Sequence, residues 1–465
     1  MSASHSPFAT ATATVPPTAL KLRATWIAHA VTLAAGVAAL MSAEMAHSET
    51  LDQAWASALA VDHRLASGRY LTEAAQKTFQ AAEATRWPTV ALQGGYTRLN
   101  ETPTAVGSLT LPPPLPPASL DFSLPLQQEN FYTFKTEVTL PLYTGGRIER
   151  GIAAANALVG ASQNDEARLA LDVKLAVAQA YLASLRAVRF IEVAQSNVAS
   201  LTSFSTDVTN LFEQGVVARN DTLAASVALA DAAQRLIVAR NALNLAHASY
   251  NRLLGRPLTE PVMLQELPLP PVSANMATSN IAVLTSRAQT IRPELSMLAN
   301  QGDALRAQSA SVRGGLAPQV ALIGAYSRQQ NRYQAHEGIA SIGVGVKWDL
   351  FDGGLVRAQS DALSARAASV AALREESLSL IALQVRQAWL NTQETTERLE
   401  VASAAVNSAD ENLKLARDRY SQGLANNTEV LEAETQRTRT ATNFHSATYD
   451  VLLAQLQLKR ATGEL

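Results

Sequence analysis

The chain contains one unit twice, and this internal repeat limits its possible folds more than any other feature of the sequence. The segment around Gly145 and Gly146 recurs without gaps 208 residues later, around Gly353 and Gly354. The motifs at 179–182, 214–215 and 255 recur at the same offset, at 387–390, 422–423 and 463. Because such a duplication repeats a whole architecture, we expect one fold built from two similar halves.

An upstream segment repeats at a different offset. Residues 88–98 match residues 318–328, an offset of 230 residues. The two offsets differ by 22 residues, so the first copy carries an insertion at 102–125, which is rich in proline and is expected to be a surface loop. A second proline-rich segment, 257–280, is expected to be a linker between the copies.

Composition excludes several classes of function. The 465 residues would ordinarily suggest more than one domain, but the repeat favours a single body made from two copies. The net charge of −2 gives no sign of nucleic-acid binding. There is no cysteine, and the seven histidines lack metal-ligand spacing. No catalytic grouping of side chains occurs, so we expect no enzyme, no cofactor and no metal site.

The N-terminus has the pattern of an export signal. Lys21 and Arg23 precede an apolar run at 28–41 that is too short to span a bilayer, and Ala46 and Ser48 fit a cleavage site. A short buried helix is the alternative. We expect 1–48 to be a signal peptide, and no later segment to be apolar enough for a transmembrane helix.

Alternating side chains predict two strands in each copy. The segment 341–351 places Ile342, Val344 and Val346 on one face and small or polar residues on the other. The other strands are expected at about 88–98, 131–143 and 318–328. Such segments are typical of an outer-membrane barrel, and a soluble half-buried sheet is the alternative. Four strands are too few to close a barrel alone, so several chains must contribute. Four aromatic residues at the strand ends are the expected membrane-interface residues: Trp87, Tyr143, Trp348 and Phe351.

Each copy continues with a long helix and a returning helix. The segments 147–213 and 355–421 contain no proline and would each form about 100 Å of helix at about 1.5 Å per residue. Gly215 and Gly423 occupy the left-handed position that commonly follows a helix. The returning helices are expected at 219–254 and 427–462. The predicted repeats, 49–256 and 281–465, therefore each contain an initial helix, two strands and a helical hairpin.

Glycine pairs mark the change from strand to helix in both copies. Such pairs permit a sharp bend of the backbone. A phosphate-binding loop is the alternative, but the spacing of such a loop is absent. We interpret the following glycines as strand-to-helix hinges: Gly145, Gly146, Gly353 and Gly354.

Together these features resemble the TolC-like outer-membrane efflux protein family, the outer membrane factors. The resemblance covers about 51–465, and its most specific motifs lie at 141–146, 348–354 and 420–433. It implies a mixed fold, all-α plus membrane β, in which a homotrimer forms a twelve-stranded β-barrel continuous with a long α-helical periplasmic barrel. It also implies an exit duct of tripartite efflux or type I secretion. The implied partners are outer-membrane lipid, a periplasmic adaptor (membrane fusion) protein and an inner-membrane RND or ABC pump.

The resemblance further implies an acidic ring at the tunnel entrance. The acidic residues of this ring correspond to Glu429 and Glu432, which are neighbours on one helix face. Helix capping, together with Asn426, is the alternative role for these acids.

The family holds its entrance shut through polar links between the two helical hairpins. The corresponding residues here are Asp221 and Tyr420. The arginine that often takes part is replaced by Ala425, so the resemblance implies a lock that is either weaker or relocated to Arg219.

Two other classes of protein fit parts of the sequence. A periplasmic adaptor also has a long helical hairpin, but it would have a single hairpin between lipoyl-like halves. A soluble coiled-coil scaffold would lack the alternating strands.

Overall fold

The computed structural model describes residues 48–110, 112–114, 119–269 and 280–465, so the predicted signal peptide lies outside the described residues except for Ser48. The chain forms two compact units. In the smaller unit, which includes Pro261–Gln265, Glu49 forms a parallel bridge with Leu264. The larger unit comprises Leu51–Glu260 and Glu266–Leu465 and contains both copies of the repeat.

Each copy opens with two helices, whereas the sequence predicted one. The helices are α2 (Leu51–Val61) and α3 (His63–Ala84) in the first copy, and α7 (Ile281–Ile291) and α8 (Pro293–Arg313) in the second. Asp62 breaks the first pair, because its carboxylate accepts hydrogen bonds from the amides of Arg64 (2.8 Å) and Leu65 (3.1 Å) and so begins a new helix. Pro293 separates α7 from α8, because it has no amide hydrogen with which to continue the preceding helix.

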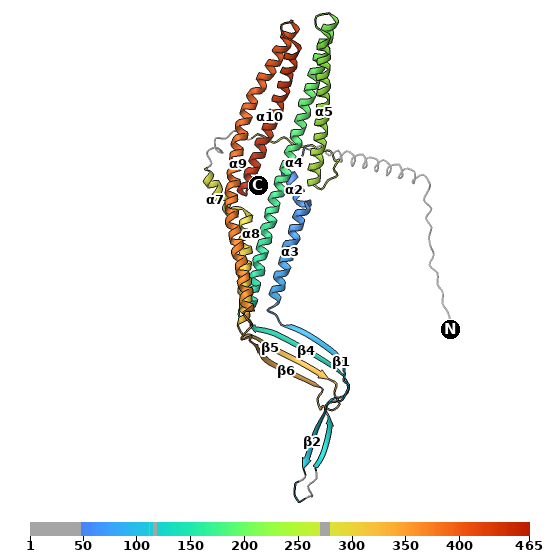
Figure 1. Ribbon diagram of the computed structural model, residues 1–465, viewed down its shortest axis with the longest axis vertical. Helices are drawn as coiled ribbons and strands as arrows, with labels where there is room; N and C mark the ends of the chain where they lie inside the picture. The colour runs from blue at the N-terminus through green and yellow to red at the C-terminus, as the bar shows by residue number, and fades with distance from the viewer. Residues whose placement is uncertain (1–47, 111, 115–118, 270–279) are drawn as a thin grey trace, which may run out of the picture. The chain divides into compact units, whose positions relative to one another are not determined.

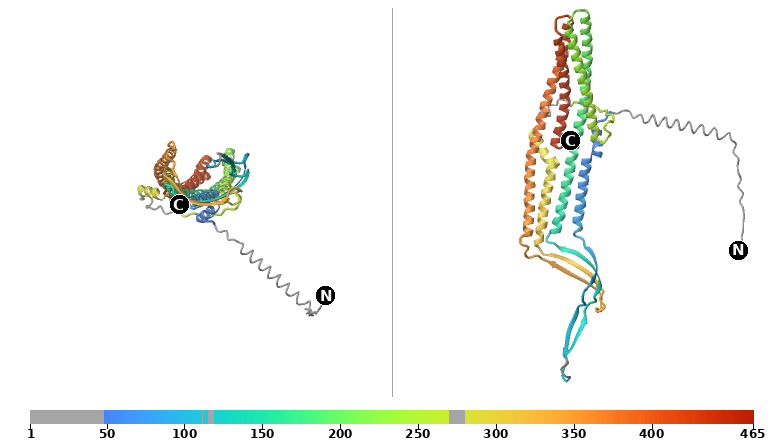
Figure 2. Two further views of the ribbon diagram at one scale, coloured as in Figure 1. Left: turned by 90° about the horizontal axis from the view of Figure 1, so that it is seen from below. Right: turned by 45° about the vertical axis from the view of Figure 1, so that its right-hand side comes forward.

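Four antiparallel strands from both copies form one sheet in the order β1-β4-β5-β6. They are β1 (Thr89–Arg98), β4 (Asn130–Tyr143), β5 (Gln319–Gln329) and β6 (Gly338–Lys347). The central pair, β4 and β5, joins the first copy to the second. Figure 2 shows the sheet continuing beyond the ends of α3, α4, α8 and α9.

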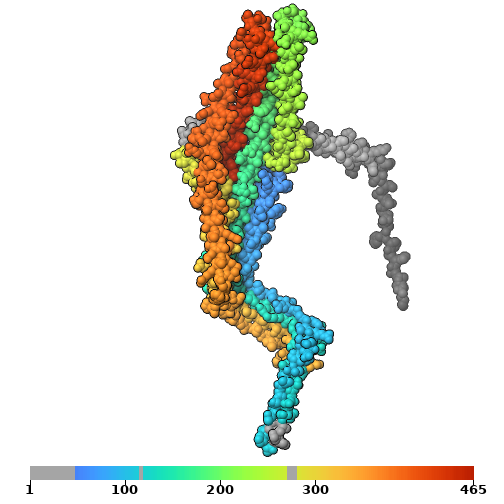
Figure 3. All heavy atoms as spheres, viewed as in Figure 1, coloured from blue at the N-terminus to red at the C-terminus, as the bar shows by residue number. Residues whose placement is uncertain are grey.

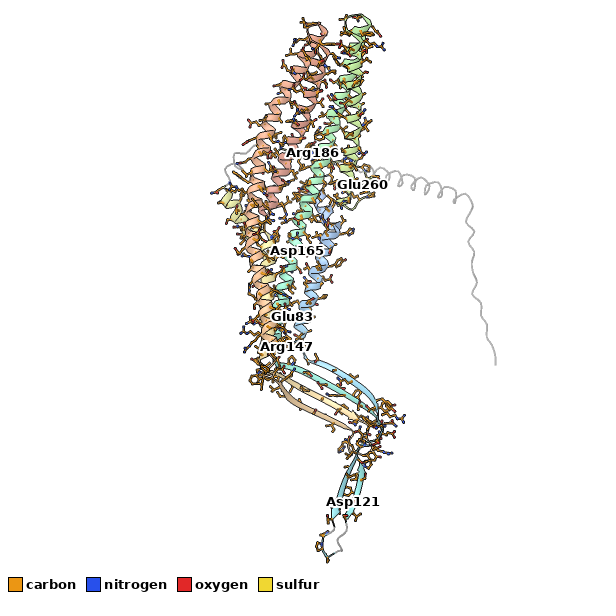
Figure 4. All side chains as sticks on the ribbon, viewed as in Figure 1. Glu83, Asp121, Arg147, Asp165, Arg186 and Glu260 are labelled. Carbon is orange, nitrogen blue, oxygen red and sulfur yellow. The ribbon has the colours of Figure 1, made fainter. Side chains whose placement is uncertain are left out.

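The strand expected at 341–351 is displaced. It begins at Gly338 and ends at Lys347, so Trp348 and Phe351 lie outside it. The reason is the partner strand: Lys347 pairs with Gln319, the first residue of β5, and no further ladder is available beyond that point. The expected surface loop at 102–125 was also wrong, because it contains an antiparallel hairpin of β2 (Thr104–Thr110) and β3 (Ser119–Pro125). Figure 4 labels Asp121 on this hairpin.

The long helices form two antiparallel hairpins. They are α4 (Arg147–Glu213) with α5 (Arg219–Leu253), and α9 (Leu355–Ser421) with α10 (Asn427–Thr462). Figures 1 and 3 show α10 between α9 and α4, and α10 packs on both. Along α4 the buried side chains include Val177 and Tyr181, and the ring of Tyr181 lies edge-on to that of Tyr250 at 6.0 Å. The core therefore runs along α4, and Figure 4 labels Arg147, Asp165 and Arg186 at successive points of this helix.

A partly buried ionic cluster joins the two copies where α8 begins. Arg460 of α10 donates to Asp172 of α4 (2.7 Å) and to Glu294 of α8 (2.9 Å). Arg292 pairs with the same Glu294 at 2.8 Å. Burial alone would raise the pKa of Glu294, but the hydrogen bonds from the two arginines outweigh it and lower the pKa to about 2.

We expect acid to weaken this junction. Because the pKa of Glu294 falls from 4.5 to about 2 on folding, its stabilisation is present above pH 4.5 and is lost as the pH falls to 2. The difference corresponds to about 3 kcal/mol, so Glu294→Gln should flatten the loss of stability between these two pH values. Urea unfolding followed by circular dichroism across this range tests it. The exposed Glu375 is the control, since Glu375→Gln should leave the parent profile unchanged. An unchanged profile for Glu294→Gln would contradict the assignment.

Candidate functional site

One face of the sheet is apolar across all four strands. Residues paired across neighbouring strands share a face, and the register aligns Leu322 with Leu140 and with Val344. The same face includes Val90, Leu92, Val138, Val320, Ile342 and Val346. Ile342 is 79% exposed and Val344 is 62% exposed. The sheet therefore presents a large apolar surface that the described part of the chain does not cover.

The opposite face of the sheet is polar. Lys135 and Glu137 lie on this face of β4 and form an ion pair at 2.6 Å. Ser341 of β6 lies on the same face, since it pairs with Ala325, which in turn pairs with Glu137. The two faces therefore have the different chemistries that a sheet between apolar and aqueous surroundings requires.

Aromatic residues lie at both ends of the sheet. Trp87 precedes β1, Tyr143 ends β4, and Trp348 and Phe351 follow β6, so the four predicted aromatics are gathered at the end where the strands meet the helices. The indole of Trp348 donates to the carbonyl of Leu316 at 3.0 Å.

A second aromatic group, which was not predicted from the sequence, lies at the far end of the sheet. Tyr96 and Tyr132 are paired in the ladder, and their ring centroids are 5.2 Å apart. Both tyrosines are exposed. Only the strand register brings them together, although the position of each near a strand end was visible in the sequence.

The four hinge glycines all have positive φ, from 62° at Gly145 to 86° at Gly354. The two copies differ in how strictly they need glycine. A side chain at Gly145 would meet the carbonyl of Gly314 at 2.5 Å, whereas nothing lies within 4 Å of the same position at Gly353. In the second copy, Asp352 accepts hydrogen bonds from the amides of Gly354 and Val356, and these lower its pKa. The bend therefore depends on close packing in one copy and on a carboxylate cap in the other.

The turn from α4 to α5 and the turn from α9 to α10 lie at the same end of the hairpins, which we call the tip (Figure 1). Gly215 has φ 74° and Gly423 has φ 73°. In both turns the glycine amide and the next amide donate back to the last helical turn, as Gly423 to Tyr420 (3.0 Å) and Leu424 to Arg419 (2.8 Å) show. This is the Schellman pattern, which requires the left-handed residue.

The predicted gate residues are close together, but a different residue makes the link. Tyr420 is buried against Phe204, with ring centroids 5.5 Å apart. Burial raises the pKa of Tyr420, and the charge of Asp221 raises it further. No partner for the Tyr420 hydroxyl lies among the described residues. Beside them, the side-chain amide of Asn427 donates to the carbonyl of Asp221 at 3.0 Å, which is a hydrogen bond from one hairpin to the other.

The predicted entrance glutamates lie in the first two turns of α10. The amide of Glu429 donates to the side chain of Asn426 at 2.9 Å, so Asn426 caps the helix. The carboxylate of Glu429 lies 3.4 Å from Arg419 instead of completing a capping box. Glu432 is exposed. Arg219 is exposed and forms no ion pair among the residues described.

Glu434, which lies two residues beyond Glu432, was not predicted from the sequence. The residue is 1% exposed, and its side chain contacts residues of α4 and α9. Helical spacing gave no signal for it, because its partners come from distant parts of the chain.

Helix α5 departs from the expectation that no later segment is apolar enough to span a membrane. By length and composition this helix could do so, and only 11% of its apolar segment is buried. It packs along α4, however, as one half of a hairpin. Its exposed apolar side chains include Leu223, Val227, Ile237, Val238 and Leu245.

Comparison with known proteins gives one family and one fold. The sequence profile of the outer membrane efflux protein family matches residues 55–256 and 284–464. No curated protein matches the sequence of this chain. The structure is similar to the outer-membrane channel OprN, with a TM-score of 0.74 and 20% identity over 89% of this chain and 90% of that chain.

Two further structures share the fold. The outer membrane protein VceC of Vibrio cholerae has a TM-score of 0.72 and 17% identity, with 89% of this chain and 96% of that chain covered. The open state of the MtrE outer membrane channel of Neisseria gonorrhoeae has a TM-score of 0.69 and 16% identity, with 89% and 88% covered.

We expect the tip turn at Gly423 to tolerate asparagine but not valine. Nothing lies within 4 Å of the position of an added side chain, so the cost of Gly423→Val is backbone strain and not a clash. That strain is about 1–2 kcal/mol and should distort the turn. Gly423→Asn is the control, because asparagine adopts the left-handed conformation more readily. Membrane insertion and export by cells are measured for both variants. Valine should reduce export and spare insertion, and equal loss of both would place this glycine in the folding core.

Proposed function

Because the chain belongs to the outer membrane efflux protein family, we propose that it is the exit duct of a tripartite efflux or type I secretion system. Three copies form a barrel in the outer membrane and a helical tunnel that extends into the periplasm. The duct is a passive conduit, gated at its tip, where a periplasmic adaptor and an inner-membrane pump deliver the cargo.

The open sheet is the observation that supports this proposal most strongly. In the described part of the chain, β1 and β6 each pair with one strand only, so both outer edges are unpaired. Lipid cannot satisfy such edges, and strands from other copies must close the sheet. Two copies would give about eight strands, whose interior is filled by side chains. Three copies are the smallest ring that leaves a lumen.

The dimensions and the surface chemistry support the same assembly. Trp87 and Tyr96 are separated by about 30 Å of strand, or about 23 Å of height at a tilt of about 40°. This matches the apolar band of outer-membrane barrels, which is about 25 Å tall with aromatic residues at both borders. The exposed apolar face of α5 requires a cover, and a neighbouring copy in the tunnel supplies it.

The alternative of a periplasmic adaptor or scaffold fits less well. An adaptor would have one hairpin, and this chain has two, with an amphipathic sheet beyond them. A soluble coiled-coil scaffold would lack a sheet with an exposed apolar face and unpaired edges.

We expect arginine to be tolerated on one face of β6 and not on the other. Val344 lies on the apolar face, so Val344→Arg should cost about 2–4 kcal/mol near the middle of the membrane. Ser341 lies on the polar face of the same strand, so Ser341→Arg is the matched control. The yield of heat-resistant trimers from outer membranes is the measurement. Normal assembly of Val344→Arg would show that this face does not contact lipid.

We expect Glu429 and Glu432 to set the ion selectivity of the entrance. Three chains would place six carboxylates around one axis, and their field should favour cations within a screening length of about 8–10 Å. Replacing both with glutamine removes charge and keeps the shape. Single-channel recording of this double variant should show weaker cation selectivity and less block by multivalent cations. Values equal to those of the parent would leave these glutamates with a capping role alone.

A further inference from the structure

Glu434 is a buried acid at the contact between the two hairpins. Of the residues that the structure describes, only Arg292 and Glu434 are both charged and buried, and Glu434 is 1% exposed. It lies on α10 beside an apolar cluster that joins all four long helices at the tip. The cluster contains Phe204, Val208, Ala225, Leu413, Ala416, Tyr420, Val430 and Ala433.

The partners of Glu434 fall into two sets. On α4, the amide of Asn197 donates to Oε1 at 3.1 Å, and the hydroxyl of Ser200 donates to Oε2 at 2.6 Å. Within its own hairpin, Arg417 of α9 lies 3.3 Å from Oε2, and Arg437 of α10 lies 3.6 Å from Oε1. Arg417 also donates to the carbonyl of Ser200 at 3.0 Å. The carboxylate therefore connects α4 to both helices of the second hairpin.

This division lets the contact be broken without leaving a charge unpaired. If the α9–α10 hairpin moved away from α4, both arginines would move with Glu434, and its charge would stay neutralised. Only hydrogen bonds to α4 would be lost. A buried ion pair that must be split is costly to open, whereas a few hydrogen bonds can be exchanged for water at small net cost. The hydrogen bonds therefore fix the position of the second hairpin on α4, and breaking them costs little free energy.

We propose that Glu434 is the lock that holds the second hairpin against the first and keeps the tip closed. The proposal rests on the proposed function and names the residue that regulates its gate. It also accounts for Ala425: the link between the hairpins lies deeper along α10, about 12 Å from Asn426 at about 1.5 Å per residue. Glu434 acts as a positioning residue and need not touch the cargo.

Two variants test the lock. Glu434→Gln removes the charge, and the double variant Asn197→Ala with Ser200→Ala removes the hydrogen bonds from α4 to the carboxylate and keeps the ion pairs within the second hairpin. Asp410→Asn is the matched control, because Asp410 pairs with Arg437 inside one hairpin (2.7 Å). If Glu434→Gln fails to assemble into heat-resistant trimers, the double variant decides the question.

The first measurement is resting conductance in planar bilayers. Both test variants should raise it by about tenfold or more, the effect of losing one or two charge-assisted hydrogen bonds. The yield of heat-resistant trimers should not change for the double variant, and Asp410→Asn should resemble the parent. A purely structural role would reduce trimer yield and leave the conductance of assembled channels unchanged.

The second measurement is independent of channel function. The chain has no cysteine, so spin labels can be placed at Gln214→Cys and Gln422→Cys, one in each tip turn. Labelled chains are assembled with an excess of unlabelled chains, so that distances within one chain dominate. The test variants should lengthen and broaden the distance between the labels. Unchanged distances and conductance in the double variant would overturn the lock. A parent protein that forms no channel would overturn the proposed function, while the distances would still test the lock.

Discussion

The packing of the second copy against α4 is the contact on which the rest of the larger unit depends. Each copy contributes one helical hairpin and two strands of the four-stranded sheet, and α10 and α8 both lie on α4. Because β4 leads directly into α4 and β5 follows α8, the same contact places the two central strands side by side. The sheet therefore runs across both copies because the helices of the two copies pack together.

The sequence predicted the family correctly, and it located the long helices well for a physical reason. The segments expected at 147–213 and 355–421 coincide with α4 and α9, because glycine pairs precede each helix and a left-handed glycine follows it. The ends of strands are harder to predict, because alternating side chains indicate which sheet face a residue lies on but not which residues of a neighbouring strand it pairs with. Lys347 ends β6 only because Gln319 begins β5. The hairpin at 104–125 was missed because its prolines concealed two short alternating segments.

The candidate site was predictable only where it depends on local spacing. Glu429 and Glu432 are one turn apart on α10, and the sequence alone places them there. Contacts between residues that are far apart in the sequence could not be predicted in this way. Asp221 and Tyr420 were expected to link the hairpins, but the hydrogen bond to Asp221 comes from Asn427 and not from Tyr420. Nothing in the sequence distinguishes Glu434 from the other acids of the helices, and only the approach of α4 buries it.

The two buried charged residues, Arg292 and Glu434, both lie where the copies meet, but separating the copies would break different interactions at each. Arg292 belongs to a cluster in which Arg460 bonds Asp172 across the copies, so separation there would split an ion pair. Glu434 meets α4 only through hydrogen bonds to Asn197 and Ser200, and its arginines travel with it. The sites lie about 39 Å apart along α10, taking about 1.5 Å per residue from Glu434 to Arg460. Breaking an ion pair by removing one partner costs about 3–5 kcal/mol, several times the net worth of a hydrogen bond, about 1 kcal/mol. The contact between the copies is therefore hard to open where α8 begins and easy to open at the tip, which is the asymmetry that the proposed gate at the tip requires.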